Sequence, residues 1–379
     1  MITLVEIVFF ILIGGSVIFY LACALCTYQF FSSASAQQQI VQNQDAPVSI
    51  LVSVRGLDEG AWENWSSLCT QNYPAYEVLF GVTDLDDPAV PVLEKLVTTF
   101  PDRVKLFVGL KPRGVNLKDS NLSYLLEHSQ HEVIIFADGD IRVNPNYIHT
   151  VTAPLYSEVD VVTCAYIGYA PLFLGAALAS LGRCVDFIPS VLIARVIDGG
   201  LRLAVGVTIA TRRSTLVNFG GLSLNRIGSD YNLGKRAALA GYKVELSHYI
   251  LDWDTGNESI KELFDRELRW ARTIRFNRGS IYYSQVFCYG TVYCLPLLLV
   301  SGFSGWAIAF SLTTLLTRYV QALVSIYTME CPKLLPWLWI LPLRDLLSFT
   351  IWVVGGFGRR VFWRGRRLRI EADGLIANG

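Results

Sequence analysis

The sequence predicts an α/β domain built on a mostly parallel sheet, with membrane-spanning helices at both ends of the chain. Strand-like and helix-like segments alternate between residues 48 and 138, which is typical of parallel sheets covered by helices on both faces. In addition, two long segments carry no charge, Ile7–Phe31 and Ile281–Thr317. Each is longer than the about 20 apolar residues that are needed to cross a bilayer.

The composition supports the membrane prediction. The chain is 52% hydrophobic and 17% charged, whereas soluble domains are about 25% charged. No lysine or arginine precedes Arg55, and the first apolar segment is longer than the core of a signal peptide, so we expect an uncleaved signal anchor. The formal net charge of zero gives no indication of a nucleic-acid partner. Eight cysteines without disulfide-framework spacing fit a reduced, cytoplasmic domain.

The sheet domain should contain four strands with helices between them. Ligands of such sheets bind beyond the carboxyl ends of the strands. Asp84, Asp86 and Asp87 follow one strand and Asp138 follows another, so both acidic clusters should face the same crevice. In chain order we expect strand Val48–Val54, helix Trp62–Cys69, strand Tyr76–Val82, helix Pro88–Phe100, strand Val104–Val108, helix Asn121–Glu127 and strand Val133–Ala137.

The remaining boundaries follow from charge and polarity. We expect an N-terminal transmembrane helix over residues 1–31, a linker over 32–45, the sheet domain over 46–257, a basic amphipathic interfacial helix over 258–280, a C-terminal transmembrane region over 281–357 and a basic tail over 358–379. Within the sheet domain, residues 171–197 are apolar but interrupted by charges. This pattern predicts an interfacial segment, with a buried core helix as the alternative.

Six arginines between Arg359 and Arg369 place the tail in the cytoplasm by the positive-inside rule. If the sheet domain is cytoplasmic too, an even number of crossings separates them. We therefore expect two spans with a turn near Gly302–Gly305. The last apolar block, Leu334–Phe357, is split by Arg344 and Asp345 and is expected to be re-entrant or interfacial, with a full third span as the alternative.

The acidic clusters suggest a nucleotide-sugar site. Asp138 and Asp140 lie one residue apart at a strand end, and carboxylates are the ligands that Mg²⁺ or Mn²⁺ prefers. A metal there would hold a diphosphate and neutralise the charge of the leaving nucleotide. The cluster at Asp84–Asp87 can accept hydrogen bonds from a uracil or a ribose.

Two further features would complete such a site. Asp230 precedes a helical pattern and is interpreted either as a helix N-cap or as the general base that deprotonates an acceptor hydroxyl. Arg269 and Trp270 would ordinarily be an interfacial snorkelling pair. As a cation near the diphosphate, Arg269 would instead stabilise the same developing charge as the metal.

Taken together, these motifs resemble the ceramide glucosyltransferase family over nearly the whole chain. The residues that carry the resemblance are Gln71–Leu79, Asp84–Ala89, Gly114–Asn116 with Asn121–Leu122, Asp138–Val143, Ser229–Tyr231, Arg266-x-x-Arg269-Trp270 and Trp363–Arg366. The same motifs are found in bacterial relatives that glycosylate hopanoid lipids.

The resemblance implies a GT-A catalytic domain on the cytosolic face that uses UDP-glucose and inverts the anomeric carbon. Carried over residue by residue, Asp87 and Asp138 match the first two conserved aspartates and Asp230 matches the base. Arg266, Arg269 and Trp270 match the (Q/R)-x-x-R-W motif, and together with Asp84 they are expected to bind the UDP-sugar.

Two departures from the family pattern bear on the substrate. Ser229 precedes the base, where the family commonly has glutamate. The segment Pro171–Ile197 contains no histidine, where animal ceramide enzymes carry one near the acceptor.

The sequence therefore predicts an inverting, multi-pass membrane transferase, most simply in a bacterial inner membrane. It would move glucose from UDP-glucose to the primary hydroxyl of ceramide or a ceramide-like lipid. The alternative is a hopanoid N-acetylglucosaminyltransferase that uses UDP-GlcNAc. Two other classes are disfavoured: a processive polysaccharide synthase would need more spans for a channel, and a non-catalytic scaffold would not need every acidic position.

Overall fold

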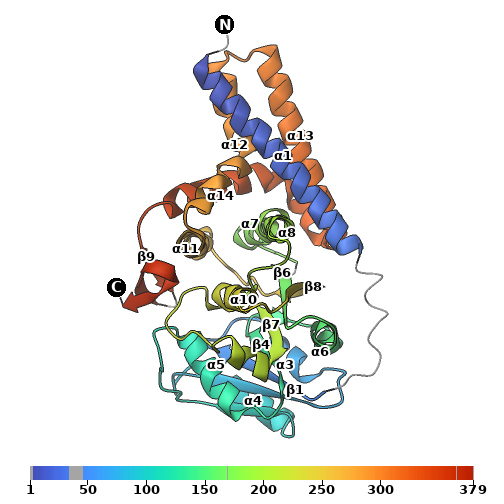
Figure 1. Ribbon diagram of the computed structural model, residues 1–379, viewed down its shortest axis with the longest axis vertical. Helices are drawn as coiled ribbons and strands as arrows, with labels where there is room; N and C mark the ends of the chain where they lie inside the picture. Colours follow the sequence, from blue (N-terminus) through green and yellow to red (C-terminus); the bar gives the residue numbers. More distant parts are fainter. Residues whose placement is uncertain (1–2, 34–45, 169, 364, 379) are drawn as a thin grey trace.

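The computed structural model describes residues 3–33, 46–168, 170–363 and 365–378; most of the predicted linker, residues 34–45, lies outside them. The molecule has three tiers (Figure 1). A sheet domain forms one end, three long helices form the other, and a layer of crosswise helices separates them. The crosswise layer includes the basic helix that carries Arg266, Arg269 and Trp270.

An eight-stranded sheet forms the centre of the sheet domain, in the order β3-β2-β1-β4-β7-β6-β8-β5. The strands β1, β2, β3 and β4 are mutually parallel, and so are β6 and β8. The predicted α/β sheet is therefore confirmed. Strand β7 departs from it, because it runs antiparallel to both β4 and β6. The strands are β1 (Val48–Val54), β2 (Tyr76–Val82), β3 (Val104–Phe107), β4 (Val133–Asp138), β5 (Ile141–Arg142), β6 (Val161–Gly168), β7 (Thr208–Arg212) and β8 (Val244–Trp253).

Helices cover the sheet and begin at local signals in the sequence. The Asn116 side chain accepts a hydrogen bond from the backbone of Asp119 and so starts α5. Gly228, in the left-handed region at φ +60°, starts α10. The covering helices are α3 (Ala61–Cys69), α4 (Val90–Thr99), α5 (Leu117–His128), α6 (Tyr147–Thr152), η1 (Ala153–Tyr156), α9 (Arg213–Asn218) and α10 (Ser229–Leu239).

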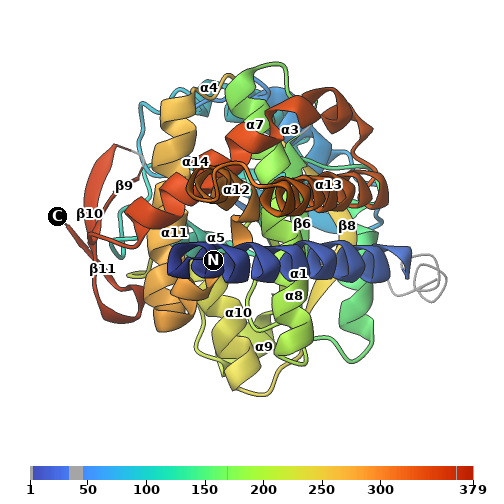
Figure 2. The ribbon, with the colours of Figure 1, turned by 90° about the horizontal axis from the view of Figure 1, so that it is seen from above.

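The opposite end consists of α1 (Leu4–Ser32), α12 (Gly290–Val300) and α13 (Gly305–Thr328), which lie side by side in Figures 1 and 2. Within the described residues, four helices are long and apolar enough to cross a membrane, or five if the bent pair Ile260–Cys288 and Gly290–Val300 counts as one span. These helices mark the chain as a membrane protein. The turn between α12 and α13 contains Gly302, at φ +60°.

The crosswise layer is formed by α7 (Leu174–Leu181), a π-helical turn η2 (Gly182–Phe187), α8 (Ile188–Ile197), α11 (Ile260–Arg278) and α14 (Leu341–Gly355). Seen from above, α7, α8 and α11 run across the direction of α1 and α13 (Figure 2). In the segment Leu174–Ile197, 78% of the most apolar stretch of 18 residues is buried inside the protein. This is the packing that the buried-helix alternative predicts. Connecting 3₁₀ segments are η3 (Gly279–Cys288) and η4 (Pro332–Ile340).

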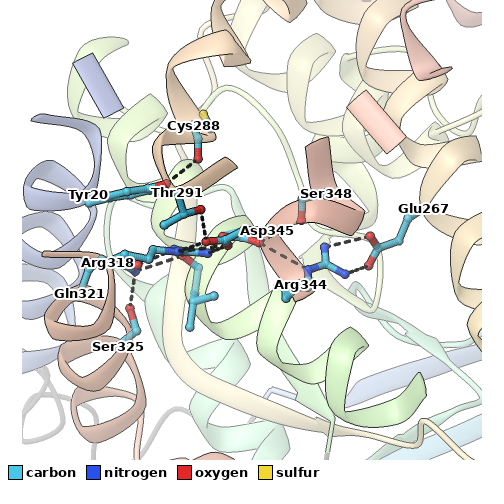
Figure 3. A network of polar contacts seen from close by, with 12 residues as sticks. Tyr20, Glu267, Cys288, Thr291, Arg318, Gln321, Ser325, Arg344, Asp345 and Ser348 are labelled. Carbon is cyan, nitrogen blue, oxygen red and sulfur yellow. Dashed lines mark hydrogen bonds and ion pairs between the residues drawn. The ribbon is translucent and has the colours of Figure 1, made fainter. Parts of the chain in front are cut away.

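A buried ionic network joins this layer to α13 (Figure 3). Arg318 of α13 is 2% exposed and lies 2.6 Å from both Asp186 and Asp345. Arg344 forms a bidentate pair with Glu267 of α11, at 2.9 and 2.8 Å. Arg344 and Asp345 therefore pair with other helices rather than with each other. In this way the network ties α11 to the membrane end of the molecule.

The basic tail forms a three-stranded antiparallel ribbon of β9 (Arg360–Trp363), β10 (Arg366–Ile370) and β11 (Ile376–Asn378), with the short turn η5 (Ala372–Gly374) before β11. The sequence analysis treated this segment only as a basic tail. The ribbon packs on the sheet domain: Leu375 bridges to Arg226, and the Ile376 N–H donates to the carbonyl of Asn225 at 3.0 Å.

Candidate active site

Asp138 is the last residue of β4 and lies at the carboxyl edge of the parallel strands, opposite Ser53 of β1. Its backbone N–H donates to the carbonyl of Val207 at 3.0 Å. The ammonium of Lys118, from the start of α5, forms an ion pair with its carboxylate and donates to the carbonyl of Gly206 at 3.2 Å. A side-chain cation thus lies against the predicted metal-binding carboxylate.

Asp230 occupies the first turn of α10, whose cap position belongs to Gly228, and its carboxylate interacts with backbone N–H groups of that turn, including that of Tyr231. Gly206 lies directly against it: a Cβ built there would be 2.0 Å from Asp230 Oδ2. Desolvation raises the pKa of Asp230, with Lys118 opposing the shift. A carboxylate with a raised pKa is a stronger proton acceptor, which is what a general base requires.

A second carboxylate, Asp119, lies beside this aspartate. It is 3% exposed, and its Oδ1 accepts a hydrogen bond from the Ser229 hydroxyl at 3.0 Å. Its Oδ2 has no hydrogen-bond partner among the described residues. Burial raises its pKa to about 7, partly offset by Lys118. The family's glutamate before the base is absent here, and a carboxylate from α5 lies at Ser229 instead.

Asp140 connects the strand edge to the basic helix α11. Its Oδ2 accepts a hydrogen bond from the indole N–H of Trp253 at 3.0 Å. The guanidinium of Arg266 lies 4.4 Å from the Trp253 ring and 5.0 Å from the Trp270 ring. The guanidinium of Arg183, from the π-helical turn η2, stacks on the Trp270 ring at 3.8 Å. The predicted acidic pair and the predicted R-x-x-R-W motif therefore meet in space.

Where Asp140, Trp253 and α11 meet, some buried polar atoms have no hydrogen-bond partner among the described residues. Arg266 forms an ion pair with Glu258 at 2.5 Å, yet its Nε and Nη2 have no hydrogen-bond partner within the described chain. Desolvation raises the pKa of Glu258 to about 7. The ring of Tyr166 packs edge-on to Trp253, and its hydroxyl interacts electrostatically with both Arg266 and Asp230. Tyr166 therefore packs against Trp253, the indole on which Arg266 stacks.

The acidic cluster after β2 divides into two kinds of residue. Asp84 lines an open cleft of about 530 Å³. Asp87 is buried, and its oxygens accept hydrogen bonds from the backbone of Gly56 at 3.0 and 2.9 Å and of Ala89 at 2.9 Å. Its position supports a role in shaping the loop after β1, next to the cleft.

Arg269 contacts the C-terminal ribbon. Its guanidinium lies 5.7 Å from the Trp270 ring and 5.3 Å from the ring of Trp363 in β9. The two arginines of the motif thus contact different surroundings: Arg266 contacts the indole bound to Asp140, and Arg269 contacts the tail.

The donor set at the strand edge suits a divalent metal only in combination with a ligand. No group of three or more histidine, cysteine, aspartate or glutamate side chains capable of holding an ion occurs within the described ranges. Asp138 and Asp140 supply hard carboxylate oxygens, and the Asp138 side chain is 27% exposed. Mg²⁺ commonly takes one or two carboxylates, with substrate phosphates and water completing its octahedron. The residues fit that mode.

Several residues at the site were not anticipated from the sequence: Lys118, Asp119, Tyr166, Arg183, Trp253, Glu258 and Arg366. Lys118 and Asp119 directly follow the Gly114–Asn116 motif, so their position offered a signal. Arg366 belongs to the Trp363–Arg366 motif and Glu258 begins the predicted basic helix, whereas Tyr166, Arg183 and Trp253 lie in segments whose sequence gives no hint of the site.

The fold defines the class of protein. The fold is similar to that of a mannosyltransferase from Pyrobaculum calidifontis. That structure aligns with 91% of this chain and 99% of its own, at 14% identity and a TM-score of 0.50. The chain has a GT-A glycosyltransferase fold.

The sequence profile of glycosyl transferase family 21 matches residues 14–376, so the chain belongs to that family. Ceramide glucosyltransferases 3 and 1 of Caenorhabditis elegans are 23% and 20% identical over 64% of this chain. The chain spans about half of their length, 54% and 53%. The resemblance to the ceramide glucosyltransferase family is confirmed.

Proposed function

We propose that the chain transfers glucose from UDP-glucose to the primary hydroxyl of ceramide or a ceramide-like lipid, with inversion at the anomeric carbon. The observation that carries the proposal is the meeting of Asp138, Asp140 and Asp230 with the R-x-x-R-W helix, beside helices long enough to cross a membrane. The similar ceramide glucosyltransferases support the choice of sugar and acceptor.

In this reaction Asp230 takes the proton of the lipid hydroxyl as its oxygen attacks the sugar's C1, and the bond from C1 to the diphosphate oxygen breaks. The backbone of Gly206 packs against the Asp230 carboxylate and limits where it can lie. Arg266 and Trp270 lie on the leaving-group side, where the unbonded guanidinium nitrogens can bind diphosphate oxygens. Asp84 binds the uridine, and Asp87 holds the loop beside it.

Asp138 and Asp140 would hold Mg²⁺ or Mn²⁺. The mannosyltransferase of similar fold was crystallised with GDP-mannose and Mn²⁺, which supports this choice of ion. When bound, the ion neutralises charge on the departing nucleoside diphosphate. Lys118 would then leave Asp138 and remain beside Asp230 and Asp119, the other carboxylates that interact with it.

The proposed topology rests on the ribbon. Because β11 is hydrogen-bonded to the sheet domain, the tail and the sheet domain share one side of the membrane. Helix α12, joined to the bent segment Ile260–Cys288, and α13 then form a pair of crossings between them, and α14 lies crosswise below α12 (Figure 1). The positive-inside rule makes the shared side cytoplasmic. In a bacterium this would be the inner membrane, and segment 171–197 would lie at its interface.

The alternative function, transfer of N-acetylglucosamine from UDP-GlcNAc to a hopanoid, is favoured by one observation. Arg183 occupies the segment where animal ceramide enzymes carry a histidine, and it stacks on Trp270. The two functions are separated by incubating the purified protein with radiolabelled UDP-glucose or UDP-GlcNAc and with ceramide, diacylglycerol or a hopanoid. We expect a labelled product from UDP-glucose and ceramide. Labelling of the hopanoid alone would establish the alternative.

A further inference from the structure

The C-terminal ribbon has an unusual position for a terminal segment, because its own small hydrophobic core is shared with the sheet domain. Side chains of all three strands pack against a loop residue of the sheet domain that precedes α10. The buried members of this core are Ile227, Val361, Leu368, Ile370 and Ile376. A terminal tail that served only to carry positive charge would not need this packing.

The ribbon is anchored to the loops that line the open cleft. Arg366 of β10 donates from its Nη1 to the carbonyl of Val115 at 3.0 Å, and the N–H of Val115 donates to the Asn225 side chain at 3.0 Å. Val115, Asn225 and Arg366 all line the cleft of about 530 Å³ that contains Asp84. The ribbon is therefore one of its walls.

The cleft is rich in arginine. Arg55 follows β1, Arg113 precedes α5 and Arg366 comes from β10, and all three line the cleft. Arg113 is paired bidentately with Glu127, at 2.5 and 2.8 Å. Arginine presents a planar fork of N–H donors that matches phosphate oxygens. The lining thus has the chemistry of a site for an anionic nucleotide.

The opposite edge of the ribbon contacts the catalytic helix. Trp363 of β9 lies 5.3 Å from the guanidinium of Arg269 in the R-x-x-R-W motif. Strands β9 and β10 are paired, with Trp363 opposite Arg366. Two paired residues of the ribbon therefore have different neighbours. Arg366 lines the cleft that contains Asp84, and Trp363 contacts Arg269 of α11.

We propose that the C-terminal ribbon completes the donor site and that Arg366 binds the anionic nucleoside diphosphate of the UDP-sugar. This inference rests on the proposed function. The basic tail then has two roles. Arg366 binds the UDP-sugar, and the other arginines favour the cytoplasmic side of the membrane. The end of the chain is then also necessary for donor affinity.

The test measures UDP binding to the purified full-length protein in detergent by isothermal titration calorimetry, with Mg²⁺ present. Arg366→Ala should weaken UDP binding at least about tenfold, the size expected for one charge-assisted hydrogen-bonded pair. Arg366→Lys should fall between it and the unsubstituted protein, because lysine keeps the charge but not the fork. The KM for the lipid acceptor should not change.

The matched control is Arg369→Ala. Arg369 lies on the same strand but is exposed, and it pairs across the ribbon with Arg360. It should bind UDP as the unsubstituted protein does. Equal UDP affinity in Arg366→Ala and Arg369→Ala would overturn the inference while leaving the proposed function intact. If the unsubstituted protein itself does not bind UDP, the proposed function fails as well.

A second measurement avoids substitutions. Trypsin cleaves after arginine, and arginines are concentrated between Arg359 and Arg369. UDP with Mg²⁺ should slow cleavage within the ribbon of the unsubstituted protein, and UDP should not slow it in Arg366→Ala. Cleavage in this segment at the same rate with and without UDP, under conditions in which UDP is bound, would count against the inference.

Discussion

Two regions contain largely buried arginines beside carboxylates: the candidate active site around Arg266, here called the crevice, and the network around Arg318 and Arg344. They differ in how completely these groups are hydrogen-bonded. In the network (Figure 3), Asp345 accepts hydrogen bonds from Arg318 at 2.6 Å and from Thr291 at 2.7 Å, and Glu267 accepts two from Arg344. Among the described residues, the network leaves one nitrogen without a hydrogen bond, Arg344 Nε, and it still lies 3.5 Å from Asp186. In the crevice, Arg266 has two nitrogens without a partner in the same part of the chain.

Asp119 and Glu258 show the same pattern as Arg266, since each has one carboxylate oxygen without a hydrogen-bond partner in the described parts of the chain. Buried polar groups are almost always hydrogen-bonded, so a cluster of exceptions needs an explanation. A substrate that supplies the missing partners is one. This difference supports the proposal that the crevice binds a substrate, whereas the groups of the network are paired within the protein.

The largest effect that separates the two regions should come from removing divalent ions. EDTA should abolish sugar transfer, and Mg²⁺ or Mn²⁺ should restore it, because Asp138 and Asp140 need a cation between them and the diphosphate. The melting temperature should change little, since the carboxylates of the network are neutralised by Arg318 and Arg344. Undiminished transfer in EDTA would contradict the metal assignment.

Substitution in the network should have the opposite outcome. Arg318→Met leaves Asp186 and Asp345 without their shared partner, and breaking a buried pair in this way typically costs about 3–5 kcal/mol. We expect a much lower unfolding temperature in detergent, with UDP affinity of the remaining folded protein unchanged. A variant that is as stable as the unsubstituted protein but does not bind UDP would reverse the assignment of the two regions.

Gly206→Ala tests the crevice by displacing the Asp230 carboxylate. The new methyl would overlap Asp230 Oδ2 and come within 2.7 Å of its Cγ, so the carboxylate must move. We expect kcat to fall about 10- to 100-fold, since small misplacements of a reacting group are costly, with little change in UDP affinity. Gly305→Ala is the control, because a Cβ there meets no atom within 4 Å.

The smallest effect concerns pH. The pKa of Asp119 is raised from its ordinary value of 3.8 to about 7, so the folded protein retains a proton that the unfolded chain releases. The free energy of unfolding should therefore fall as the pH rises from about 4 to 7. Asp119→Asn should flatten this part of the melting-temperature profile. An identical profile in Asp119→Asn would show that Asp119 is not the group responsible.

Local patterns predicted much of the crevice. The strand ending at Asp138 and the amphipathic helix carrying Arg266 and Trp270 were expected, because the periodicity of apolar residues shows in the sequence. The partners of these residues were not expected. Trp253 reaches Asp140 across 113 positions, and Ser229 reaches Asp119 across 110. Contacts of this kind arise from the order of strands in the sheet, which no local pattern encodes.

The antiparallel strand and the ribbon were missed for related reasons. Strand β7 is short and buried, and periodicity does not tell its direction. In the tail, the abundance of arginine was interpreted as a topology signal, although Leu368 and Ile370 alternate with arginines as a half-buried strand requires. The Arg344–Asp345 step was recognised as charged, but its partners lie on α11 and α13.

The most direct test of the account is Asp230→Asn, with turnover and UDP affinity measured on the same preparation. A general base contributes about 10²–10⁴-fold, so turnover should fall by that factor while UDP affinity and melting temperature stay near those of the unsubstituted protein. Asparagine is similar in size and can keep a role in the first turn of α10. Near-normal turnover in Asp230→Asn would contradict the base assignment and, with it, the proposed chemistry of the crevice.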